Sequence, residues 1–247
     1  MANTKDNSEW FKDWFNSPYY HLLYNNRNTS EANLFIDKLA MHLKLKKEAA
    51  VWDLACGKGR HSIKLNELGY NVVGTDLSQE SIEEASTFSN KTLDFFVHDM
   101  RTPFRINYFD AVLNLFTSIG YFSDKRDNFA VFQNVYNALK PQGIFVIDFF
   151  NAAKVKSCLI AVAEEKRGDL MFTISKRLEG DKIIKNIKVN DKGKHFNFEE
   201  NVWMYTLPDL MNYAAKAGFV LKETFGNYNL DKFDEQNSDR LIVIFSK

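Results

Sequence analysis

The chain has few cysteines, and this scarcity limits the kinds of protein it can be. Cys56 and Cys158 are the two thiols in 247 residues, and neither lies in a Cys/His cluster with the spacing of a zinc site. A bound metal is therefore not expected. Two thiols do not make a disulfide framework, so we expect a protein of the reducing cytoplasm.

Long apolar runs and an excess of one charge are also missing. No stretch of about 18 or more apolar residues occurs in the sequence, which predicts that no segment spans a membrane. Basic and acidic residues balance at 32 each, whereas a nucleic-acid binder usually carries a basic excess. We therefore expect a small-molecule partner, no nucleic acid and no membrane, in a monomer or a homodimer.

What the sequence does contain is an alternation of short apolar strands and helical segments. Strands are expected at residues 51–54, 71–75, 93–97, 109–115 and 143–149, with helices at 60–68, 79–89 and 127–139 between them. This alternation predicts an α/β fold, in which helices cover both faces of a mostly parallel sheet.

The two ends of the chain depart from this pattern. Residues 169–206 read as three charged strands joined by turns, which predicts an antiparallel insertion. A helix at 208–217 and strands at 219–225 and 241–245 follow. An aromatic run precedes a helix at 30–47, and the apolar area of these side chains suits a mobile cover over a ligand site. We expect one domain over residues 1–247, with an N-terminal helical lid at 1–29 and the insertion at 169–206.

Acidic residues come at the ends of three predicted strands. Asp53 lies in the first strand, Asp76 ends the second and Asp99 follows the third. Because parallel strands bring their carboxyl ends to one edge of a sheet, these carboxylates should converge on a ligand crevice. Asp76 is placed to accept hydrogen bonds from both hydroxyls of a ribose. Asp99 could accept one from an adenine amine, while Met100 packs on the purine.

The turn after the first strand discriminates between nucleotide ligands. Gly57 and Gly59 allow a sharp turn and a close approach of the ligand to the backbone. The dinucleotide fingerprint requires a third glycine where this chain has Ser62. Asp53 would also repel a pyrophosphate. The turn therefore favours a positively charged or zwitterionic ligand.

Taken in order, five motifs resemble those of the class I S-adenosylmethionine-dependent methyltransferases. They are VWDLACGKG at 51–59, VGTDLS at 73–78, HDMR at 98–101, FDAV at 109–112 and LKPQG at 139–143. Within the class, the chain is similar to the amino-sugar N,N-dimethyltransferases and more distantly to glycine N-methyltransferase. The resemblance implies S-adenosylmethionine as methyl donor and S-adenosylhomocysteine as product. It also implies a Rossmann-like sheet of seven strands in the order 3-2-1-4-5-7-6, with the last strand antiparallel.

The resemblance further implies which residues hold the cofactor. Arg27 would pair with the cofactor carboxylate, and Tyr20 or Tyr24 would close over its methionine part. The expected set is Tyr20, Tyr24, Arg27, Asp53, Ala55, Gly57, Gly59, Asp76, Leu77, Asp99, Met100, Asn114 and Leu115.

The acceptor region carries no diagnostic motif. Methyl transfer is an in-line displacement that needs alignment and exclusion of water rather than a catalytic triad. The polar candidates around the expected acceptor mouth are His195, Tyr121, Asp148 and Glu200, and the methylated atom would be nitrogen or oxygen. Two other functions stay open at this point. One is a non-catalytic S-adenosylmethionine-binding module, and the other is a nicotinamide-dependent oxidoreductase.

Overall fold

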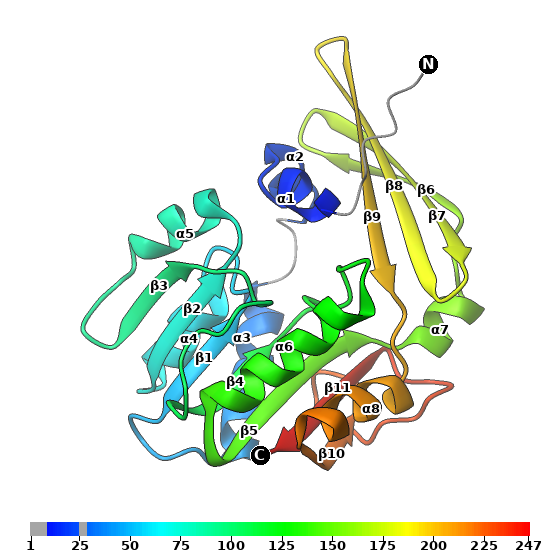
Figure 1. Ribbon diagram of the computed structural model, residues 1–247. Coiled ribbons are helices and arrows are strands. Elements are labelled where there is room, and N and C mark those ends of the chain that lie inside the picture. Colours follow the sequence, from blue (N-terminus) through cyan, green and yellow to red (C-terminus); the bar gives the residue numbers. More distant parts are fainter. Residues whose placement is uncertain (1–8, 25–28) are drawn as a thin grey trace.

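A seven-stranded sheet forms the centre of the computed structural model, which describes residues 9–24 and 29–247 (Figure 1). The strand order is β10-β11-β5-β4-β1-β2-β3. The strands are β1 (Ala50–Leu54), β2 (Asn71–Asp76), β3 (Leu93–Val97), β4 (Phe109–Asn114), β5 (Leu139–Phe150), β10 (Val220–Phe225) and β11 (Arg240–Ser246). Numbered within this sheet alone, the order is 3-2-1-4-5-7-6, and β11 runs antiparallel to both neighbours. The predicted fold class and strand order are confirmed.

Helices cover both faces of this sheet because successive strand residues point to opposite sides. Val51 joins the core beneath α3 (Thr29–Leu43), α4 (Arg60–Glu67) and α5 (Gln79–Ser86). Its neighbour Trp52 joins the core beneath α6 (Lys125–Ala138) and α8 (Leu207–Ala217). Within the described ranges, no helix is both long and apolar enough to cross a membrane.

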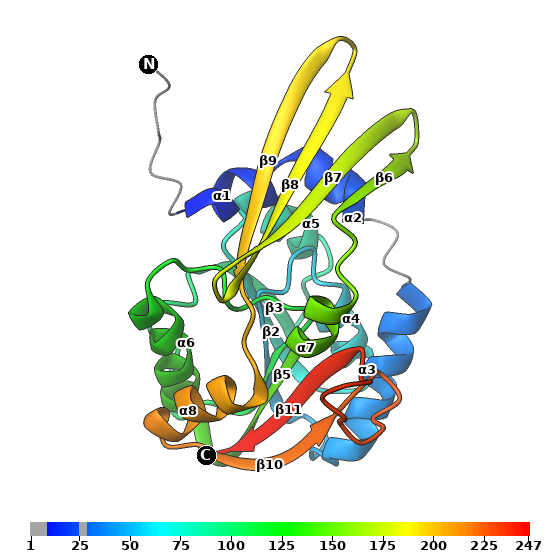
Figure 2. The same cartoon turned by 90° about the vertical axis from the view of Figure 1, so that its right-hand side faces the viewer.

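A separate antiparallel sheet stands above the carboxyl edge of the parallel strands (Figure 2). The short helix α7 (Ala152–Ser157) leads into it from β5. It contains β6 (Val162–Arg167), β7 (Leu170–Glu179), β8 (Lys182–Asp191) and β9 (Lys194–Trp203), in that order. The sequence predicts the last three strands and misses β6. The segment Val162–Arg167 carries four charged residues in six and lies at the sheet edge, so it lacks an apolar pattern.

Two short helices lie between the parallel strands and the antiparallel sheet (Figures 1 and 2). They are α1 (Trp10–Phe15) and α2 (Pro18–Tyr24). Trp14 is 1% exposed, and its ring lies 4.5 Å from that of Phe198 on β9. Arg27 lies outside the described residues.

Candidate active site

A cavity of about 1090 Å³ lies at the carboxyl edge of the parallel strands. Its floor is made by the strand ends and the turns after them, and its other walls come from α1, α2, β8 and β9. Pockets for a drug-sized ligand span roughly 300–1,000 Å³, so two small molecules have room here. Ten of the expected cofactor residues line it: Tyr20, Tyr24, Asp53, Ala55, Gly57, Asp76, Leu77, Asp99, Met100 and Leu115.

The turn after β1 presents its backbone to the cavity. Ala55 and Gly57 adopt positive φ angles of 63° and 55°, which turn the chain sharply. The Gly57 amide donates a hydrogen bond to Asp76 Oδ2 at 2.8 Å. A Cβ added to Gly57 would meet no protein atom within 4 Å. Because Gly57 lines the cavity, that Cβ would occupy space open to a ligand.

Two other residues of the expected cofactor set, Gly59 and Asn114, do not line the cavity. Gly59 precedes α4 with a φ of 79°, and a Cβ there would come within 2.6 Å of the Phe95 ring. It is a glycine because the helix packs closely on β3, and it does not line the cavity. Asn114 is fully buried, and its Nδ2 donates to the Leu54 carbonyl at 3.0 Å, which braces β4 against β1.

Asp53 is a nearly fully buried carboxylate at the cavity floor. Its Oδ2 accepts a 2.6 Å hydrogen bond from Ser62 Oγ, the residue that stands in place of a third glycine. Burial raises the pKa of Asp53 to about 6, and the nearby Asp76 charge adds to the rise. The ionised form therefore gains from a ligand that brings positive charge.

Asp76 ends β2 and points its carboxylate into the same floor. Oδ2 accepts from the Gly57 amide, and Oδ1 accepts from the Ser78 amide at 2.9 Å. Burial nevertheless raises its pKa above the usual value. The amides of Ser78, Gly57 and Leu77 each oppose that rise. Asp76 also lines the cavity, so its carboxylate is placed to accept from a ribose hydroxyl.

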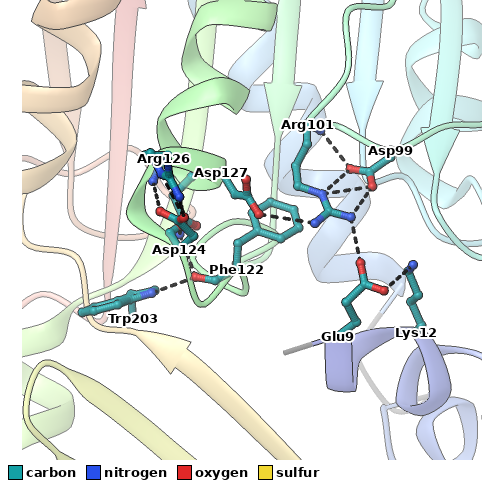
Figure 3. A network of polar contacts seen from close by, with 10 residues as sticks. Glu9, Lys12, Asp99, Arg101, Phe122, Asp124, Arg126, Asp127 and Trp203 are labelled. Atoms are coloured by element: carbon teal, nitrogen blue, oxygen red, sulfur yellow. Dashed lines mark hydrogen bonds and ion pairs between the residues drawn. The ribbon is translucent and has the colours of Figure 1, made fainter. Parts of the chain in front are cut away.

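Asp99 is held by an arginine that also reaches the N-terminal helices (Figure 3). Arg101 Nε and Nη2 bond the Asp99 carboxylate at 3.0 and 2.6 Å, and Nη2 also contacts Glu9 Oε1 at 3.0 Å. Burial raises the pKa of Asp99, but the hydrogen bonds and charge of Arg101 outweigh it and the pKa falls below its usual value. The Asp99 carboxylate is therefore ionised and fixed in place. Through Glu9, the residue directly before α1, Arg101 also connects this carboxylate to the N-terminal helices.

The four catalytic candidates separate into two that line the cavity and two that do not. Tyr121 and Glu200 line it. Asp148 is fully buried and accepts hydrogen bonds from Arg240 Nε at 2.8 Å and from the Phe116 amide at 2.9 Å. Its carboxylate is therefore engaged by other residues of the chain. His195 is exposed and lies five residues before Glu200 on β9, hence on the opposite face of that strand. Neither Asp148 nor His195 lines the cavity.

Glu200 connects the antiparallel sheet to the N-terminal helices. Its Oε1 accepts from Trp14 Nε1 at 2.8 Å and from the Tyr24 hydroxyl at 2.6 Å. Lys185 on β8 donates to the same hydroxyl, and its Nζ lies 3.6 Å from Glu200 Oε2. These groups fix α1 and α2 over the cavity from above.

Among its site residues, sequence reasoning named none of the four cations that line the cavity within the described ranges, which are Lys58, Arg60, Lys185 and Arg240. Lys185 lies on β8 and reaches the cavity because its strand face is shared with Glu200, its cross-strand partner. Arg240 is the first residue of β11 and pairs with Phe150 of β5, which lies more than 80 residues earlier in the sequence. No motif surrounds either residue. The alternation of Ile183 and Lys185 on one face of a strand was the available signal.

The comparisons with known proteins agree with this geometry. Residues 51–143 match the model of a methyltransferase domain. The Bacillus subtilis protein YqeM, named as a methyltransferase, is 37% identical over 115 residues, which are 45% of this chain and 46% of YqeM. The chain thus matches about half the length of that relative.

Solved structures show the same fold over nearly the whole chain. A S-adenosylmethionine-dependent methyltransferase from Clostridium acetobutylicum has a TM-score of 0.78 at 22% identity, covering 92% of this chain and 95% of that one. The sugar N-methyltransferase KedS8 from Streptoalloteichus has a TM-score of 0.72 at 20% identity, covering 92% of both chains. At these identities the likeness is one of fold.

Proposed function

We propose that this chain, a member of the S-adenosylmethionine-dependent methyltransferase family, methylates a nitrogen or oxygen atom of a small molecule, with nitrogen favoured. The carrying observation is that one cavity combines the carboxylates at the strand ends with a second, aromatic half. The first half suits the cofactor, and the second leaves room for an acceptor beside it.

The residues of the cavity floor fit S-adenosylmethionine. This cofactor supplies a methyl group already activated on a cationic sulfonium, together with an ammonium group and a ribose. Asp76 lines the cavity with its carboxylate placed for the ribose hydroxyls, and Gly57 lets the ligand approach the backbone closely. Asp53, whose pKa is raised by burial, gains from nearby positive charge.

The aromatic half of the cavity suits methyl transfer because it excludes water. Trp10 and Phe15 from α1 and Tyr121 from the turn after β4 line it, and their rings are in mutual contact at 5.3–5.7 Å. Glu200 lies on the same cavity wall as an ionisable group that can take up the proton of an attacking amine. The sugar N-methyltransferase activity named for KedS8 supports nitrogen as the acceptor atom.

Methyl transfer can be tested with matched amine and alcohol acceptors. The protein is incubated with S-adenosylmethionine carrying a labelled methyl group and with benzylamine or benzyl alcohol, and products are identified by mass spectrometry. We expect label in the amine, and loss of transfer in the Asp76→Ala variant. Transfer to the alcohol alone would overturn the preference for nitrogen. Tight binding of S-adenosylmethionine with no transfer across a broad acceptor panel would indicate a non-catalytic binding module.

A further inference from the structure

Arg240 presents an unused part of its guanidinium to the cavity. The side chain is 19% exposed, and the residue lines the cavity. Nε donates to Asp148 Oδ1 at 2.8 Å, and Nη2 donates to Thr117 Oγ1 at 3.1 Å. A guanidinium has five N–H groups, and Nη1 makes no hydrogen bond to any residue in the described part of the chain. Three donors therefore remain on the Nη edge.

The surroundings hold this guanidinium in one orientation. Asp148, fully buried, also accepts from the Phe116 amide at 2.9 Å and from the Tyr228 hydroxyl at 3.3 Å. The carboxylate is thus fixed from three sides. Because it takes the Nε edge of Arg240, the Nη edge is directed away from the pair.

The turn that carries Thr117 is strained, and the strain serves this arrangement. Phe116 and Thr117 have positive φ angles of 58° and 63°. Such angles are unfavourable for a bulky or β-branched residue and persist only where neighbours over-determine them. Here the Asp148 side chain accepts a hydrogen bond from the Phe116 amide. The backbone carbonyl of Asp148 accepts one from the Thr117 amide at 2.9 Å. The result places the Thr117 hydroxyl against Arg240.

Arg240 lies away from the cofactor half of the cavity. It pairs with Phe150 at the end of β5, whereas Asp76 ends β2 and Asp99 follows β3. β5 and β2 are separated in the sheet by β4 and β1. Arg240 is therefore remote from the residues expected to hold the ribose and the adenine, and we assign a ligand group at Arg240 to the second molecule in the cavity.

We propose that the Nη edge of Arg240 binds an anionic oxygen group, a carboxylate or a phosphate, on the methyl acceptor. A planar pair of N–H donors matches two oxygens of either group. Nη1 has no hydrogen bond within the described part of the chain and is not a buried atom, so its N–H groups are open to the cavity. Arg240 thus keeps one edge directed into the cavity. The inference rests on the proposed function, since it assigns this wall to the acceptor.

The test uses small aromatic probes with the protein saturated by S-adenosylhomocysteine. Benzoate and phenyl phosphate carry the two kinds of oxyanion, and benzamide is the uncharged shape control. Binding is measured by ligand-observed NMR titration. We expect at least one oxyanion to bind about tenfold or more tightly than benzamide, and the tighter of the two identifies the group. Equal binding of all three probes would overturn the proposal.

Two variants assign the effect to Arg240. Arg240→Lys keeps a positive charge beside buried Asp148 but loses the fork, so the preference for the oxyanion should fall about tenfold or more. Lys185→Gln removes another cation that lines the cavity, and the preference should stay. The opposite pattern, loss in Lys185→Gln and none in Arg240→Lys, would contradict the assignment.

The measurements with S-adenosylhomocysteine distinguish failure of this proposal from failure of the proposed function. Exclusion of benzoate by S-adenosylhomocysteine would place Arg240 in the cofactor's own site and overturn the inference. Failure of S-adenosylhomocysteine to bind at all would instead overturn the proposed function. In that case the same probes, titrated into the ligand-free protein, still report on Arg240.

Discussion

The buried carboxylate of Asp53 gives the sharpest prediction. Its pKa is raised in the folded protein from 3.8 to about 6, chiefly by burial. The folded state therefore binds this proton more tightly than the unfolded chain does. The contribution of Asp53 to the free energy of unfolding is then largest at low pH and decreases as the pH rises from about 4 through about 6.

The magnitude follows from the two pKa values. One pKa unit corresponds to about 1.4 kcal/mol. The linkage relation gives a destabilisation of about 1 kcal/mol at about pH 4.5 and about 3 kcal/mol at about pH 7.5. Asp53→Asn removes the ionisation and nearly keeps the shape. Relative to this variant, the wild-type protein should lose about 2 kcal/mol between those two pH values.

Urea unfolding of both proteins at several pH values measures this difference directly. The other titrating groups are common to both proteins, so they largely cancel. A ligand ammonium near Asp53 favours its ionised form, so saturating S-adenosylhomocysteine should reduce the pH dependence of the difference. Parallel stability curves for the two ligand-free proteins across this range would refute the assignment of a raised pKa to Asp53.

The remaining predictions concern the cofactor and the N-terminal helices. Asp76→Ala should weaken S-adenosylmethionine binding by about tenfold or more while the fold persists, because it removes hydrogen bonds to a charged group; unchanged affinity in calorimetry would exclude the ribose role. Gly57→Val should abolish binding, since its side chain enters ligand space, and should also lower stability because φ is 55° there; normal binding by a folded variant would show that the turn does not contact the cofactor. Hydrogen exchange in α1 and α2 should slow when S-adenosylhomocysteine binds, and Trp14→Phe, which keeps an aromatic side chain but loses the indole N–H bond to Glu200, should speed it. Equally slow exchange with and without ligand would identify these helices as a fixed part of the structure rather than a lid.

The sequence predicted those site residues whose position depends on the parallel sheet alone. Asp53, Asp76 and Asp99 come where apolar strands stop, and a parallel sheet brings such ends together regardless of the packing detail. Gly57 and Gly59 could not be told apart in the same way. The difference between them is the Phe95 ring, which packs on one and leaves the other open to the cavity.

Residues on the antiparallel sheet were harder to place because register decides their direction. Glu200 and His195 are both polar residues of β9, yet an odd separation puts them on opposite faces. Which face meets the cavity depends on the docking of α1, whose Trp14 packs on Phe198. The role of Arg240 could not be predicted because its partners Asp148 and Thr117 are distant in sequence and meet it only in the folded chain.

Calorimetric titration with S-adenosylhomocysteine, with NAD titrated in parallel, tests the central claim most directly. The account predicts saturable binding of S-adenosylhomocysteine with one site per chain, a rise in melting temperature at saturation, and no such response to NAD. Binding of NAD in place of S-adenosylhomocysteine, or of neither ligand, would contradict the assignment of this cavity to S-adenosylmethionine.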